Sequence, residues 1–112
     1  MGLDMFRRKN DKLALEEFKN GVLRQFPEAR FILFGSKARG EEVKFSDRDV
    51  LVVLRRDIVT DIEKSIFGVG FETGLRFGVI FGIVVEQESF FDSALAKAMP
   101  FYQNIAKEGA QL

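Results

Sequence analysis

The chain has 112 residues, of which 46% are hydrophobic and 30% charged, and its 17 basic residues balance its 17 acidic ones. This apolar content is enough for a packed core and too high for a disordered chain, and the length predicts one domain over residues 1–112. The neutral charge argues against tight, nonspecific binding to a nucleic-acid duplex, which needs a basic surface, although a local basic patch stays open.

The sequence contains no cysteine and no histidine. These absences exclude a disulfide framework, a structural zinc site, a Cys or His nucleophile and a histidine general base. Any chemistry must therefore use carboxylates, hydroxyls, Lys, Arg or backbone amides. The chain lacks an N-terminal signal core and any run of about 18 apolar residues, so we expect a soluble cytoplasmic protein that does not enter a membrane.

The first half of the chain predicts one helix and two strands. Residues 1–9 are expected to be a frayed start, and apolar residues at helical spacing predict a helix over residues 10–25, which Pro27 ends. Continuous apolar runs at 31–34 and 50–54 predict strands covered on both faces, as in α/β proteins.

The second half predicts a helix, a strand and two further helices. The sequence "TDIE" at 60–63 reads as a capping box and predicts a helix that begins at Thr60 and runs to about Arg76. A strand over 79–85 is expected to follow, and the last two helices are expected over 88–98 and 100–108. The expected order is α-β-β-α-β-α-α, which indicates an α/β (α+β) fold.

Two residue types are unusually concentrated in the second half. The glycines between residues 68 and 82 do not form a dinucleotide-binding fingerprint, so we expect them to permit close packing of helix on sheet. The 13 phenylalanines are expected to lie mostly in the core. The alternative is that some form a partner or self-association face, and the candidates are Phe67, Phe71, Phe77, Phe90, Phe91 and Phe101.

Gly35 and Ser36 follow the first expected strand directly. Glycine lets a ligand approach the backbone closely because it has no Cβ atom. Residues 36–40 can form a single helical turn whose free amides, together with the Ser36 hydroxyl, would face outward as phosphate donors. Taken alone, this short stretch is better explained by a plain turn.

Asp47 and Asp49 precede and open the most apolar strand of the chain. Residues i and i+2 of a strand point to the same face, so the two carboxylates can converge on a hard cation such as Mg²⁺. The alternative is a solvated turn in which Arg48 neutralises both neighbours. The position of the pair, shortly after Gly35 and Ser36, favours a metal–nucleotide site.

The stretch "LFGSKARGEEVKFSDRDVLVVL" resembles the signature of the minimal nucleotidyltransferases of the DNA polymerase β superfamily. That signature comprises an apolar strand, Gly-Ser, a turn often reading A-R-G, and an acid-x-acid pair opening a second strand. The tail "PFYQNIAKEGAQL" is similar to the closing helix of small prokaryotic members. The resemblance implies the nucleotidyltransferase fold, a small mixed sheet of about three strands flanked by helices, and transfer of a nucleoside monophosphate from a nucleoside triphosphate.

The resemblance also implies roles for the motif residues. Gly35 and Ser36 would hold the triphosphate, and Asp47 and Asp49 would act as catalytic metal ligands. Mg²⁺ is the implied cofactor, with two ions in the scheme that stabilises the attacking and leaving oxygens of an in-line displacement.

Three further residues are candidates with open alternatives. Lys37 and Arg39 could face the phosphates, or Lys37 could be solvated and Arg39 paired with the acids at 41–42. Active relatives carry a third acid on the third strand, and Glu86, more than Glu88, is the candidate for this metal ligand and catalytic residue. Both glutamates could instead be solvated.

The expected substrates and partners come from the resemblance as well. ATP is the expected donor, with a protein or small-molecule acceptor. A HEPN-type protein is the expected partner, with this chain as the antitoxin. The alternative is a catalytically degenerate module of the same fold that neutralises a partner by contact, and a homodimer stays open. We expect no strong nucleic-acid binding, because the chain is too short to add a template groove.

Overall fold

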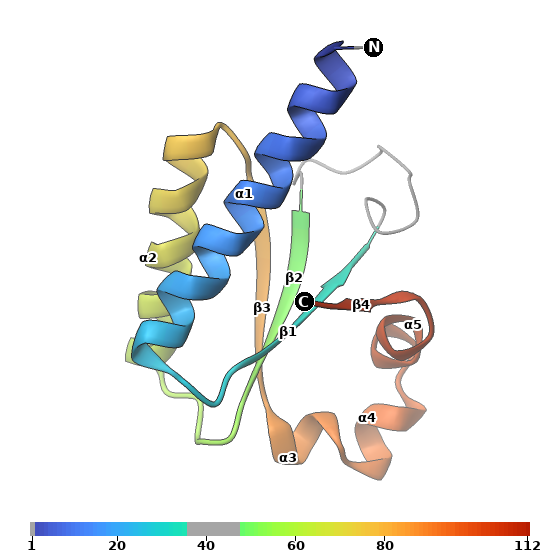
Figure 1. Cartoon of the computed structure of the whole chain (residues 1–112). Coiled ribbons are helices and arrows are strands. Elements are labelled where there is room, and N and C mark those ends of the chain that lie inside the picture. The colour runs from blue at the N-terminus through green and yellow to red at the C-terminus, as the bar shows by residue number, and fades with distance from the viewer. Residues whose placement is uncertain (1, 36–47) are drawn as a thin grey trace.

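The computed structural model describes residues 2–35 and 48–112, which form a mixed sheet with helices on both faces (Figure 1). The elements in chain order are α1 (Gly2–Gln25), β1 (Arg30–Phe34), β2 (Arg48–Leu54), α2 (Thr60–Phe77), β3 (Phe81–Gln87), α3 (Glu88–Phe91), α4 (Ala94–Ala98), α5 (Pro100–Glu108) and β4 (Ala110–Gln111). The predicted α/β (α+β) fold with a small mixed sheet flanked by helices is confirmed.

The sheet has the strand order β3-β2-β1-β4, so β2 lies between β3 and β1. β2 pairs parallel with β3 and antiparallel with β1. The helix α2 connects β2 to β3 along the chain. Six of the seven residues of β2 are buried, which explains its continuous apolar sequence. β4 adds two residues antiparallel to β1, and it is too short to leave a periodic signal in the sequence.

α1 and α2 cover one face of the sheet (Figure 1). Phe18 and Val22 of α1 pack with Ile66 of α2 against alternate residues of the strands, among them Val50 and Val52. The glycines of α2 permit close packing, as predicted. A Cβ atom at Gly70 would lie 2.3 Å from Ile83 Cδ1, and one at Gly74 would lie 2.5 Å from the carbonyl oxygen of Val79.

α3 and α5 cover the opposite face. Ile105 of α5 packs on Leu51 and Val53 of β2, and Phe91 and Tyr102 complete this second cluster. The two clusters together explain why the apolar runs of β1 and β2 do not alternate with polar residues. Within the described ranges, no helix is both long and apolar enough to cross a bilayer.

Three local predictions differ from the structure. α1 begins at Gly2, so most of the stretch expected to be frayed is helical; it contains no proline, and Leu, Met, Arg and Lys favour helix. α2 has Val59 at its N-cap without a side-chain hydrogen bond, so the predicted capping box at Thr60 is wrong. The amides of Ile62 and Glu63 bond instead to the carbonyl of Val59.

The helix predicted over 88–98 is interrupted. α3 ends at Phe91, and α4 begins after Ser93, whose hydroxyl accepts a hydrogen bond from the Ala96 amide at 3.1 Å. The same hydroxyl donates to the Phe90 carbonyl at 2.6 Å. Ser93 therefore ends one helix and caps the next, which side-chain bonding to the local backbone allows.

Candidate nucleotide and metal site

Gly35 directly follows β1 and adopts a backbone conformation that favours glycine. Its φ is 84°, and among the described residues only Gly78 shares a positive φ. A side chain at this position would meet the backbone clash that disfavours left-handed conformations. The glycine of the Gly-Ser pair is therefore required by the geometry with which the chain leaves β1.

Asp49 lies on β2, next to the end of β1. Its Cα partner on β1 is Phe34, the residue directly before Gly35. The two halves of the motif, separated in the sequence, thus meet at one end of two adjacent strands. Asp49 is buried, with 7% of its surface exposed, and by strand alternation it shares the face of Leu51 and Val53.

Four of the predicted site residues lie outside the described residues, namely Ser36, Lys37, Arg39 and Asp47. Their roles therefore stay predictions, as does the alternative ion pair of Arg39. In the two described segments there is no group of three or more acidic, His or Cys side chains placed to hold a metal ion. Of the predicted pair, the structure describes Asp49.

Glu86 lies on β3 at the opposite end of the sheet from this motif. Gly82 is the Cα partner of Asp49, and Glu86 is the partner of Val53. Glu86 is four positions after Gly82, which corresponds to about 13 Å along a strand. The role of Glu86 as third metal ligand stays a prediction, but the strand register does not bring it beside Asp49.

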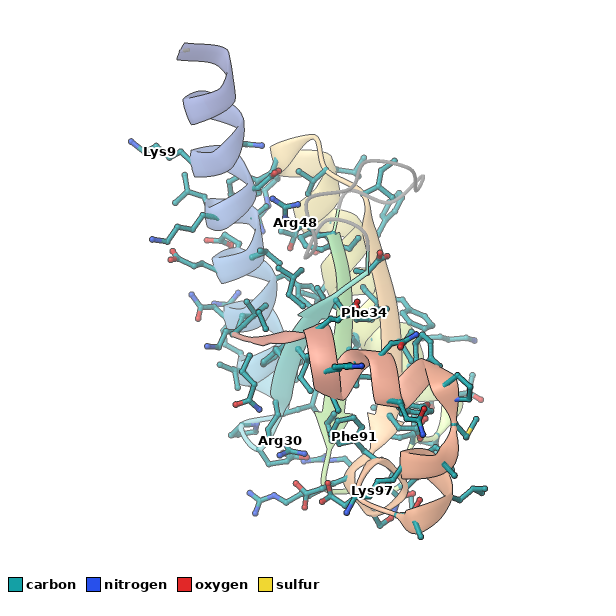
Figure 2. The ribbon with its side chains drawn as sticks, turned by 90° about the vertical axis from the view of Figure 1, so that its right-hand side faces the viewer. Lys9, Arg30, Phe34, Arg48, Phe91 and Lys97 are labelled. Carbon is teal, nitrogen blue, oxygen red and sulfur yellow. The ribbon has the colours of Figure 1, made fainter. Side chains whose placement is uncertain are left out.

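Figure 2 shows the two ends of the sheet through residues of β1 that it labels. Phe34, the partner of Asp49, lies toward the upper end, whereas Arg30 lies beside Phe91 at the lower end. Arg30 is the partner of Val53, so Glu86 belongs to this lower row. The guanidinium of Arg30 lies over the Phe91 ring at 5.7 Å from its centroid.

Glu86 has a hydrogen bond that the sequence did not reveal. The Tyr102 hydroxyl on α5 donates to Glu86 Oε2 at 2.6 Å, and the Gln87 amide donates to Oε1 at 3.1 Å. Burial of the Tyr102 hydroxyl, with the hydrogen bond to Glu86 and its negative charge as further causes, raises the pKa of Tyr102 to about 12. The contact connects β3 to α5.

Two more contacts near Asp49 were also missed from the sequence. Arg48 donates to Asp11 Oδ2 of α1 at 2.6 Å, and Figure 2 shows Arg48 between α1 and the sheet. Phe101 of α5 packs edge-on against Phe34, with ring centroids 5.5 Å apart. Both contacts join residues far apart in the sequence, and local patterns carry no signal for such pairs.

The chemistry of the described donor fits a hard divalent cation. Asp49 supplies carboxylate oxygens, and Mg²⁺ prefers oxygen ligands while keeping several waters and substrate oxygens in its shell. A site of this kind needs one or two protein carboxylates rather than a closed cage. Asp49 at the end of β2, with Asp47 two residues before it in the sequence, is consistent with such a site.

Comparisons with known proteins agree with this arrangement. The family described as "Nucleotidyltransferase domain" matches residues 15–111. The chain is 31% identical over 107 residues to MJ0604 of Methanocaldococcus jannaschii, which is named as a candidate protein adenylyltransferase. That match covers 92% of this chain and 98% of the relative.

Two solved structures share the fold. One is a chain in a mutant of the toxin–antitoxin MntA–HpeT, with a TM-score of 0.53, 18% identity, and coverage of 81% of this chain and 65% of that chain. This chain thus spans slightly less than two thirds of that one. The other is a candidate nucleotidyltransferase from Sulfolobus solfataricus, with a TM-score of 0.50, 20% identity, and coverage of 88% and 75%. The family match over most of the chain shows that this protein belongs to the nucleotidyltransferase domain family.

Proposed function

We propose that this chain transfers a nucleoside monophosphate from ATP to a protein or small-molecule acceptor in a Mg²⁺-dependent reaction. The observation that carries the proposal is the pairing of Phe34 with Asp49, because it brings Gly35, the residue directly after β1, next to the buried carboxylate of β2. A phosphate-binding turn beside a metal-binding carboxylate is the arrangement that phosphoryl chemistry needs.

Each motif residue has a role in this proposal. The backbone at Gly35 and the Ser36 hydroxyl hold the triphosphate, and Lys37 and Arg39 are the cations proposed to face it. Asp49, together with Asp47, holds Mg²⁺. The bound metal supplies charge stabilisation for the phosphate oxygens.

ATP and a protein acceptor are supported by the Methanocaldococcus relative, which is named for protein adenylyltransferase activity and matches along nearly its whole length. The fold shared with MntA–HpeT supports a toxin–antitoxin role. We therefore propose a HEPN-type protein as partner and acceptor, with this chain as the antitoxin.

A second function is favoured by one observation. Gly82, which has no side chain, lies beside Asp49 at a β3 position where a third acid would be adjacent to it. A site with only two carboxylates could bind Mg²⁺ and ATP without efficient transfer. In that case the chain would neutralise its partner by contact alone.

The decisive experiment is calorimetric titration of ATP with and without Mg²⁺, on the native chain and on Asp49→Asn. Two carboxylates hold Mg²⁺ weakly without substrate phosphates, so metal and nucleotide should bind together. Asp49→Asn should remove the Mg²⁺-dependent part of the affinity, at least about tenfold. Asp57→Asn, which removes an exposed carboxylate from the loop after β2, is the control and should bind like the native chain.

A transfer assay then separates the two functions. ATP labelled in its α-phosphate is incubated with the chain and a purified HEPN-type protein, and label on protein is measured. Label that depends on Asp49 supports the transferase. Mg²⁺–ATP binding with a stable complex and no label supports the contact-only alternative, and absence of any Mg²⁺–ATP binding by the folded chain contradicts both site assignments.

A further inference from the structure

An apolar surface lies between α2 and β3, on the face of the sheet opposite to the one that Asp49 shares with Leu51 and Val53. A groove of about 630 Å³ runs there, and its apolar lining includes Phe67, Phe71, Leu75, Ile80, Phe81 and Ile83. Four of these side chains are substantially exposed. The exposed fractions are Phe67 43%, Phe71 69%, Leu75 69% and Ile80 61%.

This surface is continuous with a sheet edge. In the sheet of the described residues, β3 is the terminal strand and pairs with β2 alone. A terminal strand presents backbone donors and acceptors that another strand can use. The apolar side of α2 and the β3 edge therefore form one surface, here called the α2–β3 face. A partner could contact both its apolar side chains and its backbone hydrogen-bonding groups.

Two charged residues of α2 lie on its α1 side, beside the α2–β3 face. Arg76 points toward α1, where its guanidinium contacts Glu17 Oε2 at 3.2 Å. Glu72 lines the same polar groove between α1 and α2. Interfaces typically have an apolar centre depleted of charge and a polar rim, and the α2–β3 face has this composition.

We propose that the α2–β3 face is the interface of a homodimer. Because β2 and β3 are parallel and α2 connects them, α2 runs opposite to β3. A two-fold axis perpendicular to the sheet sets β3 antiparallel to β3 of the second copy and α2 antiparallel to α2 of the second copy. One symmetry operation thus joins the two sheets and covers both apolar helix faces.

The helix surface is complementary to itself under this symmetry. Phe71 protrudes from the exposed face, and Gly68 lies one turn earlier, where an added Cβ would meet no atom within 4 Å. Residues three apart are neighbours on a helix surface. In an antiparallel pair of α2 helices, Phe71 of each copy faces the space above Gly68 of the other.

The area is compatible with a stable dimer. Large side chains of this kind bury roughly 150–250 Å² each, so the four exposed fractions represent about 400–600 Å² per copy. Two copies therefore bury about 800–1,200 Å² through these side chains. A stable interface buries about 1,200–2,000 Å² in total, and the upper end of this estimate reaches that range before the β3 edge is included.

The test is sedimentation equilibrium of the full chain without ATP or Mg²⁺, from about 1 to about 100 μM, the range in which moderate affinities are resolved. The native chain should approach twice the 12.8 kDa of one copy at the upper concentrations. Leu75→Glu should shift the chain to the mass of one copy. Leu95→Glu is the matched control, because Leu95 is 65% exposed on α4, and this variant should keep the dimer.

Phe71→Glu provides a second variant at the centre of the face, with helix content measured by circular dichroism. A native chain that stays at the mass of one copy throughout overturns the proposal, which would then leave the α2–β3 face to a different protein. A dimer that survives both glutamates, or that Leu95→Glu dissociates, also overturns it. None of these outcomes depends on the proposed nucleotide site.

Discussion

Asp49 and Gly82 are directly opposed residues in the parallel pairing of β2 and β3. Opposed residues of adjacent strands place their side chains on the same face of the sheet, so a side chain at position 82 would point alongside the Asp49 carboxylate. The position in this protein that is best placed to complete a carboxylate site with Asp49 thus carries no side chain. The chain could therefore bind Mg²⁺ through Asp49 and still lack the third carboxylate that efficient transfer would use.

Gly82→Asp should strengthen Mg²⁺–ATP binding by about tenfold, because an added carboxylate raises the charge offered to a hard cation. The same substitution should destabilise the chain when metal is removed, since adjacent like charges repel. Calorimetric titration of ATP with Mg²⁺ measures the first effect, and thermal unfolding in EDTA and in Mg²⁺ measures the second. The midpoint should fall below that of the native chain in EDTA and recover in Mg²⁺.

Gly82→Asn is the control for the bulk of the new side chain. It has the shape of aspartate without the charge, so its unfolding midpoint should respond to Mg²⁺ no more than that of the native chain. An equal response of the two variants to Mg²⁺ would contradict the placement of position 82 beside the metal site.

Glu86→Gln should leave Mg²⁺-dependent ATP binding within about twofold of the native value, because about 13 Å of strand separates Glu86 from the row of Asp49. An amide oxygen can still accept the Tyr102 hydrogen bond, so the fold should be retained. Calorimetric titration measures the binding. A loss as large as that expected for Asp49→Asn would instead establish Glu86 as a metal ligand.

Tyr102→Phe should lower the free energy of unfolding by about 1–2 kcal/mol, since it removes a hydrogen bond to a charged acceptor. Urea unfolding at neutral pH gives the value. In the Glu86→Gln background, Tyr102→Phe should cost less than in the native chain, because the hydrogen bond that it removes there has a neutral acceptor. Additive losses would show that the contact is not shared.

The titration of Tyr102 offers a direct optical test. The chain has one tyrosine and no tryptophan, so the near-ultraviolet absorbance of tyrosinate reports Tyr102 alone. The pKa should be about 12 in the folded chain against the ordinary 10.0 in the unfolded chain. Because the folded state holds this proton more tightly, the contribution to stability is complete below pH 10.0 and is lost as the pH rises toward about 12. Glu86→Gln should lower the pKa, and an unchanged value would contradict the role of Glu86.

Gly35→Ala should destabilise the fold by about 1–2 kcal/mol, the cost of a side chain in a left-handed conformation. It should also weaken Mg²⁺–ATP binding, because the strained backbone at position 35 shifts away from the proposed triphosphate site. Gly78→Ala is matched in backbone geometry, with φ of 68° at the end of α2. It should cost similar stability and leave nucleotide binding unchanged. If both variants lost nucleotide binding equally, the loss in Gly35→Ala would come from reduced stability alone.

Local chemistry in the sequence was sufficient to predict most of the fold. The strands β1 and β2 were predicted from their continuous apolar runs. Several helix ends were predicted from the residues beside them, namely Pro27, Pro100 and Gly109. Each of these signals acts on neighbouring residues, so it can be recognised without the tertiary structure. The sequence also singled out Gly35 for its missing Cβ atom, whereas its left-handed conformation became known only from the structure.

The tertiary structure decided the relationships between distant residues. The sequence could not reveal that Asp49 is paired with Gly82 rather than with Glu86, because strand register depends on how two faces pack at once. It also could not pair Tyr102 with Glu86 or Arg48 with Asp11, since these contacts depend on where whole helices dock. The sequence was sufficient to identify the motif from Gly35 to Asp49. The packing of the sheet decided which residues lie beside it in space.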